Sequence, residues 1–316
     1  METNSEKIIE SFLKDKKLNF FRGDDEQFDY MKIPFNIPVL DKLTGGGIPK
    51  KRFTIIYGAT NVGKSYLASQ ICANVLKAGG TAAWVDTELS WDTKWMERCG
   101  VDTSKIIVSR PPNGEEAFDS VRTLLDAAFD VVVLDSIAGL VPHKNLDEDF
   151  SYNPIAWQAR FVTQSLPKIM PSLSNGGALV AINQVRNSMG PVALDPMPGG
   201  LAQTFFAHAL LQVRREGWIE EPKGSKNRVG FEMQVRLRKS KVGGENWDSV
   251  TVPFRVDGGI DILESYIREA IQKKIIIQAG PWYTYKEQKY MGQNSLKQLF
   301  LEDEALAEEL KENVTS

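Results

Sequence analysis

Short apolar runs recur along the middle of the chain and alternate with stretches of helical spacing. The runs share an apolar, β-branched composition and the length of a strand, and they cover residues 52–57, 81–85, 105–109, 131–134, 178–182 and 209–214. After the first run, apolar residues recur at helical spacing over 66–76. Near-continuous apolar strands separated by helices are typical of a parallel sheet covered on both faces. The pattern predicts an α/β core with a mostly parallel sheet.

The amino-terminal segment follows a different pattern. Residues 1–32 predict a helical, mixed-charge arm whose apolar residues Ile8, Ile9, Phe12 and Leu13 share one face. An arm with an apolar face and no core of its own is expected either to pack back or to dock on a neighbouring molecule. We therefore treat it as an oligomerisation arm.

The carboxyl-terminal segment also departs from the parallel-sheet pattern. Residues 231–238 alternate apolar and polar positions, which predicts a strand exposed on one side. Residues 262–316 predict a small α+β module with a hairpin-like segment at 282–285 and an acidic end. The chain accordingly divides into an arm (1–32), a core (33–261) and a carboxyl-terminal module (262–316).

Composition narrows the class of protein. The hydrophobic content of 42% and the charged content of 25% are ordinary for a globular protein. A net charge of -3 argues against coating of nucleic acid through bulk positive charge, although it leaves room for local basic surfaces. Two cysteines, which we expect to be buried, and two histidines form neither a zinc spacing nor a disulfide framework. With no signal peptide and no membrane-spanning run, we expect a cytoplasmic protein without membrane contacts.

The segment from Gly58 to Ser65 reads GATNVGKS and fits the phosphate-binding loop G-x-x-x-x-G-K-[ST] at every required position. A predicted strand precedes it and a predicted helix follows it, which is the context this loop requires. Its backbone N–H groups surround phosphate oxygens at a positive helix N-terminus. Lys64 is expected to reach the β- and γ-phosphates, and Ser65 to offer its hydroxyl to Mg²⁺. The loop residues predicted to hold a nucleoside triphosphate are Gly58, Asn61, Gly63, Lys64 and Ser65.

Two acidic residues follow later strands. Asp135 ends the apolar run 131–134, which is the Walker B arrangement, and it is expected to organise Mg²⁺ through its water shell. Glu88 follows the run 81–85 at the carboxyl edge of the sheet, where ligands gather in open α/β folds. It could orient and deprotonate an attacking water, or it could cap a helix. Spacing alone leaves both interpretations of Glu88 open.

Together with the motifs already described, six segments share a recognisable order and spacing. They lie at 58–65, 86–88, 132–142, 181–186, 239–241 and 280–286. In order and spacing they resemble the signatures of the RecA family of strand-exchange recombinases, over roughly residues 33–300. The arm and the loops depart from the usual pattern, which favours a phage-encoded or divergent member. The resemblance implies a RecA-like P-loop ATPase core and a DNA-binding carboxyl-terminal module.

The resemblance assigns roles around the nucleotide. Trp95 falls where the family places a tyrosine that stacks on adenine, and Asp92 where an aspartate meets the base. Gln184 falls at the family's γ-phosphate-sensing glutamine. Lys239 and Lys241 match lysines that reach across a subunit interface to the neighbour's ATP. Without the family, a solvated strand edge would be the simpler interpretation of these two lysines.

The resemblance also places DNA contacts in two loops, at about 143–159 and about 185–201. Both loops follow predicted strands at the ligand edge of the sheet. Arg160 and Arg186 are expected to contact phosphates, and Gly199 and Gly200 to offer backbone N–H groups. Met189, with Ile155 in the first loop, falls where the family inserts apolar side chains between base triplets.

The function implied is that of an ATP-dependent recombinase that polymerises head to tail on single-stranded DNA and pairs it with a homologous duplex. The implied partners are single-stranded DNA, homologous double-stranded DNA, further copies of the chain, and single-strand-binding and loader proteins. A helicase-type motor and a recombination mediator that uses ATP as a switch are the alternatives, and residues 262–316 argue against both. The acidic stretch 302–312 could restrain duplex DNA or form a solvated terminal helix with an apolar stripe.

Overall fold

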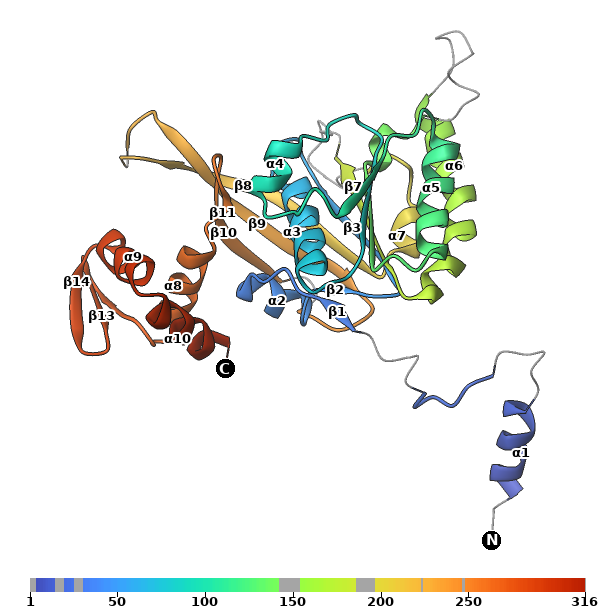
Figure 1. Ribbon diagram of the computed structural model, residues 1–316, viewed down its shortest axis with the longest axis horizontal. Coiled ribbons are helices and arrows are strands. Elements are labelled where there is room, and N and C mark those ends of the chain that lie inside the picture. The colour runs from blue at the N-terminus through green and yellow to red at the C-terminus, as the bar shows by residue number, and fades with distance from the viewer. Residues whose placement is uncertain are drawn as a thin grey trace, which may run out of the picture. The chain divides into compact units, whose positions relative to one another are not determined.

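The computed structural model describes residues 4–14, 20–25, 31–141, 154–185, 197–222, 224–245 and 248–315. The chain forms two compact units, Met1–Met31 and Lys32–Ser316 (Figure 1). The core and the carboxyl-terminal module both belong to the second unit, so the boundary drawn at residue 261 stays a prediction. No helix among the described residues is long and apolar enough to cross a membrane.

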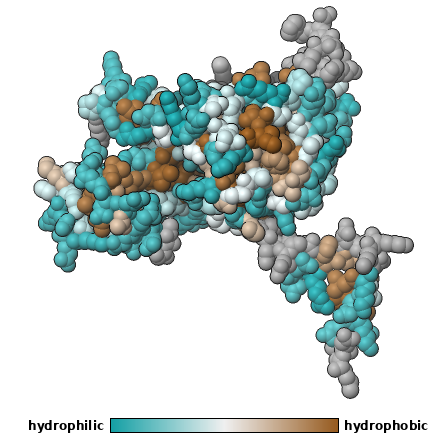
Figure 2. All heavy atoms as spheres, in the orientation of Figure 1, coloured by the Kyte–Doolittle hydropathy of each residue, from teal (hydrophilic) through white to brown (hydrophobic). Residues whose placement is uncertain are grey.

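The first unit contains the helix α1 (Asn4–Leu13). Its apolar residues Ile8, Ile9 and Phe12 are each about half exposed, at 52%, 46% and 52%. Figure 2 shows apolar side chains gathered on the visible face of this helix. Phe12 also meets Phe20 edge to face, with ring centroids 5.2 Å apart. The helix therefore presents an uncovered apolar face, as the sequence pattern predicts.

The second unit is built on a nine-stranded sheet in the order β11-β10-β9-β8-β3-β7-β6-β4-β5. The bounds are β3 Phe53–Gly58, β4 Ala82–Asp86, β5 Ile106–Ser109, β6 Val131–Asp135, β7 Ala178–Gln184, β8 Ala209–Glu220, β9 Arg228–Ser240, β10 Ser249–Arg255 and β11 Gly259–Ile260. The six strands from β8 to β5 are parallel, and β9, β10 and β11 add antiparallel pairs. The predicted α/β fold with a mostly parallel sheet is confirmed.

Helices cover both faces of the parallel strands. They are α3 Lys64–Lys77, α4 Thr93–Arg98, α5 Gly114–Asp126, α6 Pro154–Ile169 and α7 Ala202–Phe206, whereas α2 Pro38–Thr44 packs against β9 and β10. Successive strand residues face opposite sides, so Ile56 and Val133 pack in the core that holds Leu67 of α3. Ile55 and Val132 pack in the second core, with residues of α5 and α6. The continuous apolar runs are therefore strands buried on both faces.

Two features of the strands were not predicted, and the first is a separate two-stranded sheet. A short pair, β1 (Lys32–Ile33) and β2 (Ile48–Pro49), precedes β3. A Cβ on Gly47 would lie 2.1 Å from the carbonyl oxygen of Ile33, so this close approach requires glycine. In addition, β8 continues six residues past the predicted end at residue 214, because pairing with β9 persists after the apolar pattern stops.

The carboxyl-terminal module contains α8 Ile262–Gln272, β12 Ile277–Ala279, β13 Trp282–Tyr285, β14 Gln288–Met291, α9 Gln293–Glu302 and α10 Glu304–Thr315. The predicted hairpin segment is the middle strand of a three-stranded antiparallel sheet. On α10, Leu310 and Val314 are buried in the module's own core. The apolar-stripe interpretation therefore describes this helix, while a restraining effect of its carboxylates on DNA stays a prediction.

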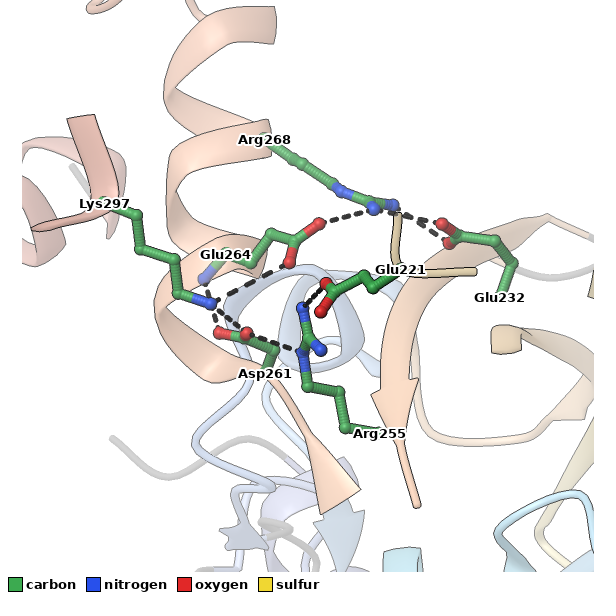
Figure 3. Close-up of polar contacts among 7 residues, drawn as sticks. All are labelled: Glu221, Glu232, Arg255, Asp261, Glu264, Arg268 and Lys297. Carbon is green, nitrogen blue, oxygen red and sulfur yellow. Dashed lines mark hydrogen bonds and ion pairs between the residues drawn. The ribbon is translucent and has the colours of Figure 1, made fainter. Parts of the chain in front are cut away.

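A network of ion pairs joins the module to the edge of the sheet (Figure 3). Arg268 of α8 reaches both carboxylate oxygens of Glu232 on β9, at 2.9 and 3.0 Å, and also Glu264 at 2.7 Å. Arg255 pairs with Glu221 at 2.6 Å. The two pairs of Arg268 are partly buried, so solvent screens them less than a fully exposed pair, whereas Glu221 is 52% exposed.

Asp261 is the centre of a second part of the same network. It caps α8 by accepting the amide of Glu264 at 3.0 Å, and it also pairs with Arg255 and Lys297. Burial favours the neutral carboxyl, but the Lys297 hydrogen bond, the Glu264 amide and the cations outweigh burial and lower the pKa of Asp261. One carboxylate thus links β10, α8 and α9.

We predict that Arg268→Ala loosens the module, because Glu232 and Glu264 lose their shared cation. The expected loss is about 1–3 kcal/mol of unfolding free energy. Urea unfolding and hydrogen exchange of α8 measure it. Arg122→Ala is the control, because Arg122 and Asp119 form a pair whose side chains are 50% and 70% exposed and should change stability by less than about 0.5 kcal/mol. Equal effects of the two substitutions would contradict a docking role for Arg268.

Candidate active site

The phosphate-binding loop connects β3 to α3. Gly63, with φ 93°, adopts the left-handed conformation, and a Cβ there would lie 2.8 Å from the sulfur of Met233. Lys64 begins the helix, and its buried ammonium donates to the carbonyl oxygen of Ala59 at 2.6 Å. Burial lowers the pKa of Lys64, while the carboxylates of Asp135 and Glu88 oppose that shift. The lysine is held over the loop, close to two acids.

Asp135 ends β6 directly beside Asp86, which ends β4. The hydroxyl of Ser65 donates to Oδ2 of Asp135 at 3.1 Å. Burial, with a further contribution from Glu88, raises the pKa of Asp135 to about 7. The Ser65 hydroxyl and the charge of Lys64 oppose this shift without cancelling it. This pair of hard oxygen donors fits Mg²⁺.

Glu88 lies just beyond β4 and is bound by two side chains. Gln184, at the end of β7, donates through Nε2 to both carboxylate oxygens, at 3.0 and 3.3 Å. The hydroxyl of Ser136 donates to the same carboxylate. The structure thus brings together Glu88 and Gln184, which are 96 positions apart in the chain. Among the described contacts, Glu88 accepts no helix-terminal amide.

The helix-capping role belongs to Asp92 instead. Its Oδ1 accepts the backbone N–H of Trp95 at 3.1 Å and begins α4. Trp95 itself is partly buried and lines the cavity next to the loop, whereas Asp92 is not among the residues that line it. The structure therefore gives Asp92 a local partner. Its predicted contact with the base stays a prediction.

Sequence reasoning missed the residue that fixes the segment carrying Glu88. Asp86 is fully buried and accepts the amides of Ser90 and Trp91, each at 3.0 Å. It also pairs with Arg110, whose Nε lies 3.3 Å from Oδ2. In the sequence, Asp86 is recognisable only as an acidic residue two positions before Glu88. Nothing in that pattern indicates its pairing with Arg110. Asp86 positions the turn that follows β4.

A cavity of about 630 Å³ opens beside the loop, which is a size suited to a small ligand. Its polar end holds residues 61–65 and Asp135. Its other walls are mainly aromatic and apolar, formed by Tyr66, Trp95, Met96, Trp218, Phe231, Phe254 and Val256. On the face seen in Figure 2, hydrophobic surface lies over the region of β10 and β11. The phosphate-binding end is thus continuous with an apolar end.

The predicted lysine pair lies at the opposite end of the sheet. The amide of Lys241 donates to the carbonyl of His208, and the amide of His208 donates to Phe53, the first residue of β3. The phosphate-binding loop instead starts at Gly58, the last residue of β3. Five strand residues span about 16 Å. The lysines therefore do not reach the cavity of their own subunit.

Both lysine ammonium groups point toward the end of α7. Lys239 donates to the carbonyls of Thr204 and Phe205, and Lys241 donates to Phe205 at 3.3 Å. Burial, followed by repulsion from Lys241, lowers the pKa of Lys239. The two cations share one face of the chain, as their spacing predicts. Both donate to carbonyl oxygens at the end of α7, with Lys239 partly buried and Lys241 exposed.

The predicted DNA-binding residues are only partly described. Arg160 is exposed on α6. Gly199 and Gly200 precede α7 with φ of 88° and 75°, while Arg186 and Met189 lie outside the described residues. The predicted end of the first loop, at residue 159, is wrong, because α6 already begins at Pro154 and includes position 155. Proline suits the first turn of a helix, where its missing N–H needs no partner.

An amide network fixes the end of the second loop to β7. Asn183 donates to the carbonyl of Pro198 at 2.9 Å and to the side chain of Gln203 at 2.8 Å. Gln203 in turn donates to Pro198 and Gly200. Both amide side chains are fully buried. Because Asn183 precedes Gln184, the loop is connected to the residue that holds Glu88.

The buried loop lysine, the Ser65–Asp135 pair and the nearby glutamate define a P-loop NTPase. The family described as the RecA N-terminal domain matches residues 5–261. Proteins named Protein RecA are similar over most of their length. That of Aquifex pyrophilus is 34% identical over 92% of this chain and 84% of its own, and that of Thermus aquaticus is 32% identical over 99% and 95%. That of Bifidobacterium longum is 32% identical over 99% and 79%.

The chain therefore belongs to the RecA family of strand-exchange recombinases. It is a DNA-dependent ATPase of DNA recombination and repair, as the family's members are. The family binds DNA, self-associates, and uses ATP and Mg²⁺.

We predict that Asp92→Asn separates the two roles of Asp92. Asparagine keeps an oxygen that caps α4 but cannot accept at its second position, so thermal stability should stay within about 0.5 kcal/mol. A contact with the base would then show as weaker ATP binding in calorimetry. Asp92→Ala is the matched variant that loses the cap, with an expected cost of about 1 kcal/mol. Unchanged ATP affinity in Asp92→Asn would leave Asp92 as a cap alone.

Proposed function

We propose that this chain hydrolyses ATP at interfaces between its own subunits while it is assembled on single-stranded DNA, and that the filament pairs that strand with a homologous duplex. One observation carries the proposal. The carboxylate of Glu88 is held by Gln184 and Ser136 next to the pair formed by Ser65 and Asp135. This arrangement supports a base, a metal-binding pair and a phosphate-binding loop acting together at one edge of the sheet.

Each residue has a distinct part in the reaction. The loop amides and Lys64 bind the phosphates, and Ser65 with Asp135 would hold Mg²⁺, which supplies charge neutralisation on the phosphate oxygens. Glu88 accepts a proton from the water that attacks the γ-phosphorus, and the bond to the ADP oxygen breaks. Gln184 keeps the Glu88 carboxylate turned toward this edge. The products are ADP and inorganic phosphate.

The neighbouring subunit supplies the remaining charge. Lys239 and Lys241 lie about 16 Å along the sheet from their own loop, and their ammonium groups are directed to α7. Positioned over a neighbour's phosphates, they would stabilise the charge that develops during transfer. The exposed apolar face of α1 supports the same head-to-tail arrangement, because Ile8, Ile9 and Phe12 need a covering surface.

Single-stranded DNA would bind near Arg160, Gly199 and Gly200. Cationic side chains and backbone N–H groups recognise the phosphate backbone without regard to sequence, which a search for homology requires. The link from Gly200 through Gln203 and Asn183 to Gln184 would let DNA in the second loop bias the position of Glu88. DNA-dependent hydrolysis follows from such a connection.

We predict that Lys64→Ala abolishes both tight ATP binding and hydrolysis, since it removes the cation that reaches the phosphates. Glu88→Gln should keep ATP binding but lower the hydrolysis rate at least about a hundredfold, because an amide cannot take the proton. Filaments should then persist on DNA. Calorimetry, phosphate release and electron microscopy check the three outcomes. Hydrolysis by Glu88→Gln at the parent rate would contradict the assignment of the base.

We predict complementation between two inactive variants. A Lys239→Ala, Lys241→Ala protein should bind ATP without hydrolysing it, and Lys64→Ala should fail on its own. When the two are mixed on single-stranded DNA, some interfaces join an intact loop to intact lysines, so part of the activity should return. Co-sedimentation of tagged subunits verifies that mixed filaments form. A mixed filament with no recovered hydrolysis would argue against a site shared between subunits.

A further inference from the structure

We propose that Arg215 is a second cationic residue of the nucleotide site, binding the phosphate groups from within the same subunit as Lys64. The inference rests on the proposed binding of ATP in the cavity beside the loop. Sequence reasoning did not single out Arg215, because it lies past the last apolar residue of the strand run at 209–214.

The register of β8 brings Arg215 next to the phosphate-binding loop. Strands β3 and β8 are parallel, and their last paired residues are Gly58 and Val213. At Gly58 the first chain turns away into the loop, whereas β8 continues to Glu220. Two residues past Val213 correspond to about 7 Å of strand. Arg215 therefore lies alongside the loop, where β8 no longer pairs with β3 but still pairs with β9.

A bulge in β8 sets the direction of the side chain. Arg215 pairs with Met233 and Gly217 with Glu232, so Glu216 is an extra residue on β8. In a regular strand, residues three apart face opposite sides. The inserted residue lets Arg215 and Trp218 share one face, and the guanidinium lies 4.2 Å from the centre of the Trp218 ring. Both residues line the 630 Å³ cavity.

The charges around the cavity favour an anionic ligand at Arg215. Among its described lining residues, Lys64 and Arg215 are the cations, and Asp135 is the one acid. In the described part of the chain Arg215 forms no ion pair with a carboxylate. Arg215 also lines a second cavity with Gly58, Ala59 and Thr60 of the loop. A guanidinium stacked on an aromatic ring keeps its planar N–H donors available at its edge, where they match phosphate oxygens.

A purely structural role is the competing explanation, and the chain offers a matched control. Arg228, at the start of β9, also lies over the Trp218 ring, 4.5 Å from its centre. Arg228 is not among the residues that line the cavity. If the guanidinium groups serve only to stabilise the β8–β9 hairpin through Trp218, removal of either should have the same consequence. If Arg215 binds phosphate, only its removal affects the nucleotide.

The test measures binding to the full chain by calorimetry, using a non-hydrolysable ATP analogue with Mg²⁺ and, separately, AMP. We expect Arg215→Ala to weaken binding of the ATP analogue by roughly tenfold to hundredfold. AMP should lose less, since it offers fewer phosphate oxygens. Arg228→Ala should bind both within about twofold of the parent, and Arg215→Lys should restore part of the loss by keeping the charge. Thermal unfolding without nucleotide checks that each variant is folded.

Three outcomes would overturn the inference: parental affinity in Arg215→Ala, equal losses in Arg215→Ala and Arg228→Ala, or equal losses for AMP and the ATP analogue. The second would assign both arginines to the hairpin, and the third would assign Arg215 to the wall around the base. Failure of the proposed function is seen separately, because the parent chain would then bind no ATP analogue at all and Lys64→Ala would not differ from it.

Discussion

The site depends on a concentration of negative charge at the carboxyl ends of β4 and β6. The parallel register sets Asp86 beside Asp135, and Glu88 follows two residues later. Asp86 and Asp135 are buried, whereas Glu88 is exposed. Asp86 obtains Arg110 and two amides, and Glu88 obtains Gln184 and Ser136. Asp135 accepts the hydroxyl of Ser65, and burial raises its pKa to about 7 although Lys64 opposes the shift.

Sequence reasoning was most successful where local patterns decide the structure. A largely apolar strand run, a glycine loop and a helical repeat are contiguous, so the β3–loop–α3 unit could be predicted from its own residues. The same holds for Asp135, which ends an apolar strand. Contacts between distant residues were different. The hydrogen bond from Gln184 to Glu88 depends on the order of strands in the sheet, and no local spacing encodes that order.

The errors also have physical causes. The strand β8 extends past its predicted end because Arg214, Arg215 and Glu216, which follow the apolar run, are charged and exposed, while antiparallel pairing with β9 needs no apolar pattern. The resemblance placed the end of the first loop at about residue 159, but α6 begins at Pro154, because proline is favourable at the start of a helix. For Glu88, a cap and a base share the same residue type, and only the partners distinguish them. Asp92, four residues later, is the cap.

Successive residues of strands β9 and β10 face two different parts of the molecule, the cavity and the carboxyl-terminal module. Phe231 and Phe254 line the nucleotide cavity, and the residues that follow them, Glu232 and Arg255, face the ion-pair network of the carboxyl-terminal module. Adjacent strand residues are joined by one peptide unit, so displacement of an aromatic wall necessarily moves the charged side chain behind it. The sheet edge is therefore both a wall of the cavity and the support of the module.

The separation of Lys239 and Lys241 from their own phosphate-binding loop has a consequence for filament polarity. In a linear filament, each interface would bring one subunit's phosphate-binding loop next to the following subunit's lysines. A filament of n subunits would therefore contain n − 1 complete interfaces. One terminus would present a cavity without lysines, and the other would present lysines without a cavity. Such termini are chemically distinct, so the two ends of a filament would gain and lose subunits at different rates. The direction of filament growth would then follow from the position of Lys239 and Lys241 at the end of strand β9.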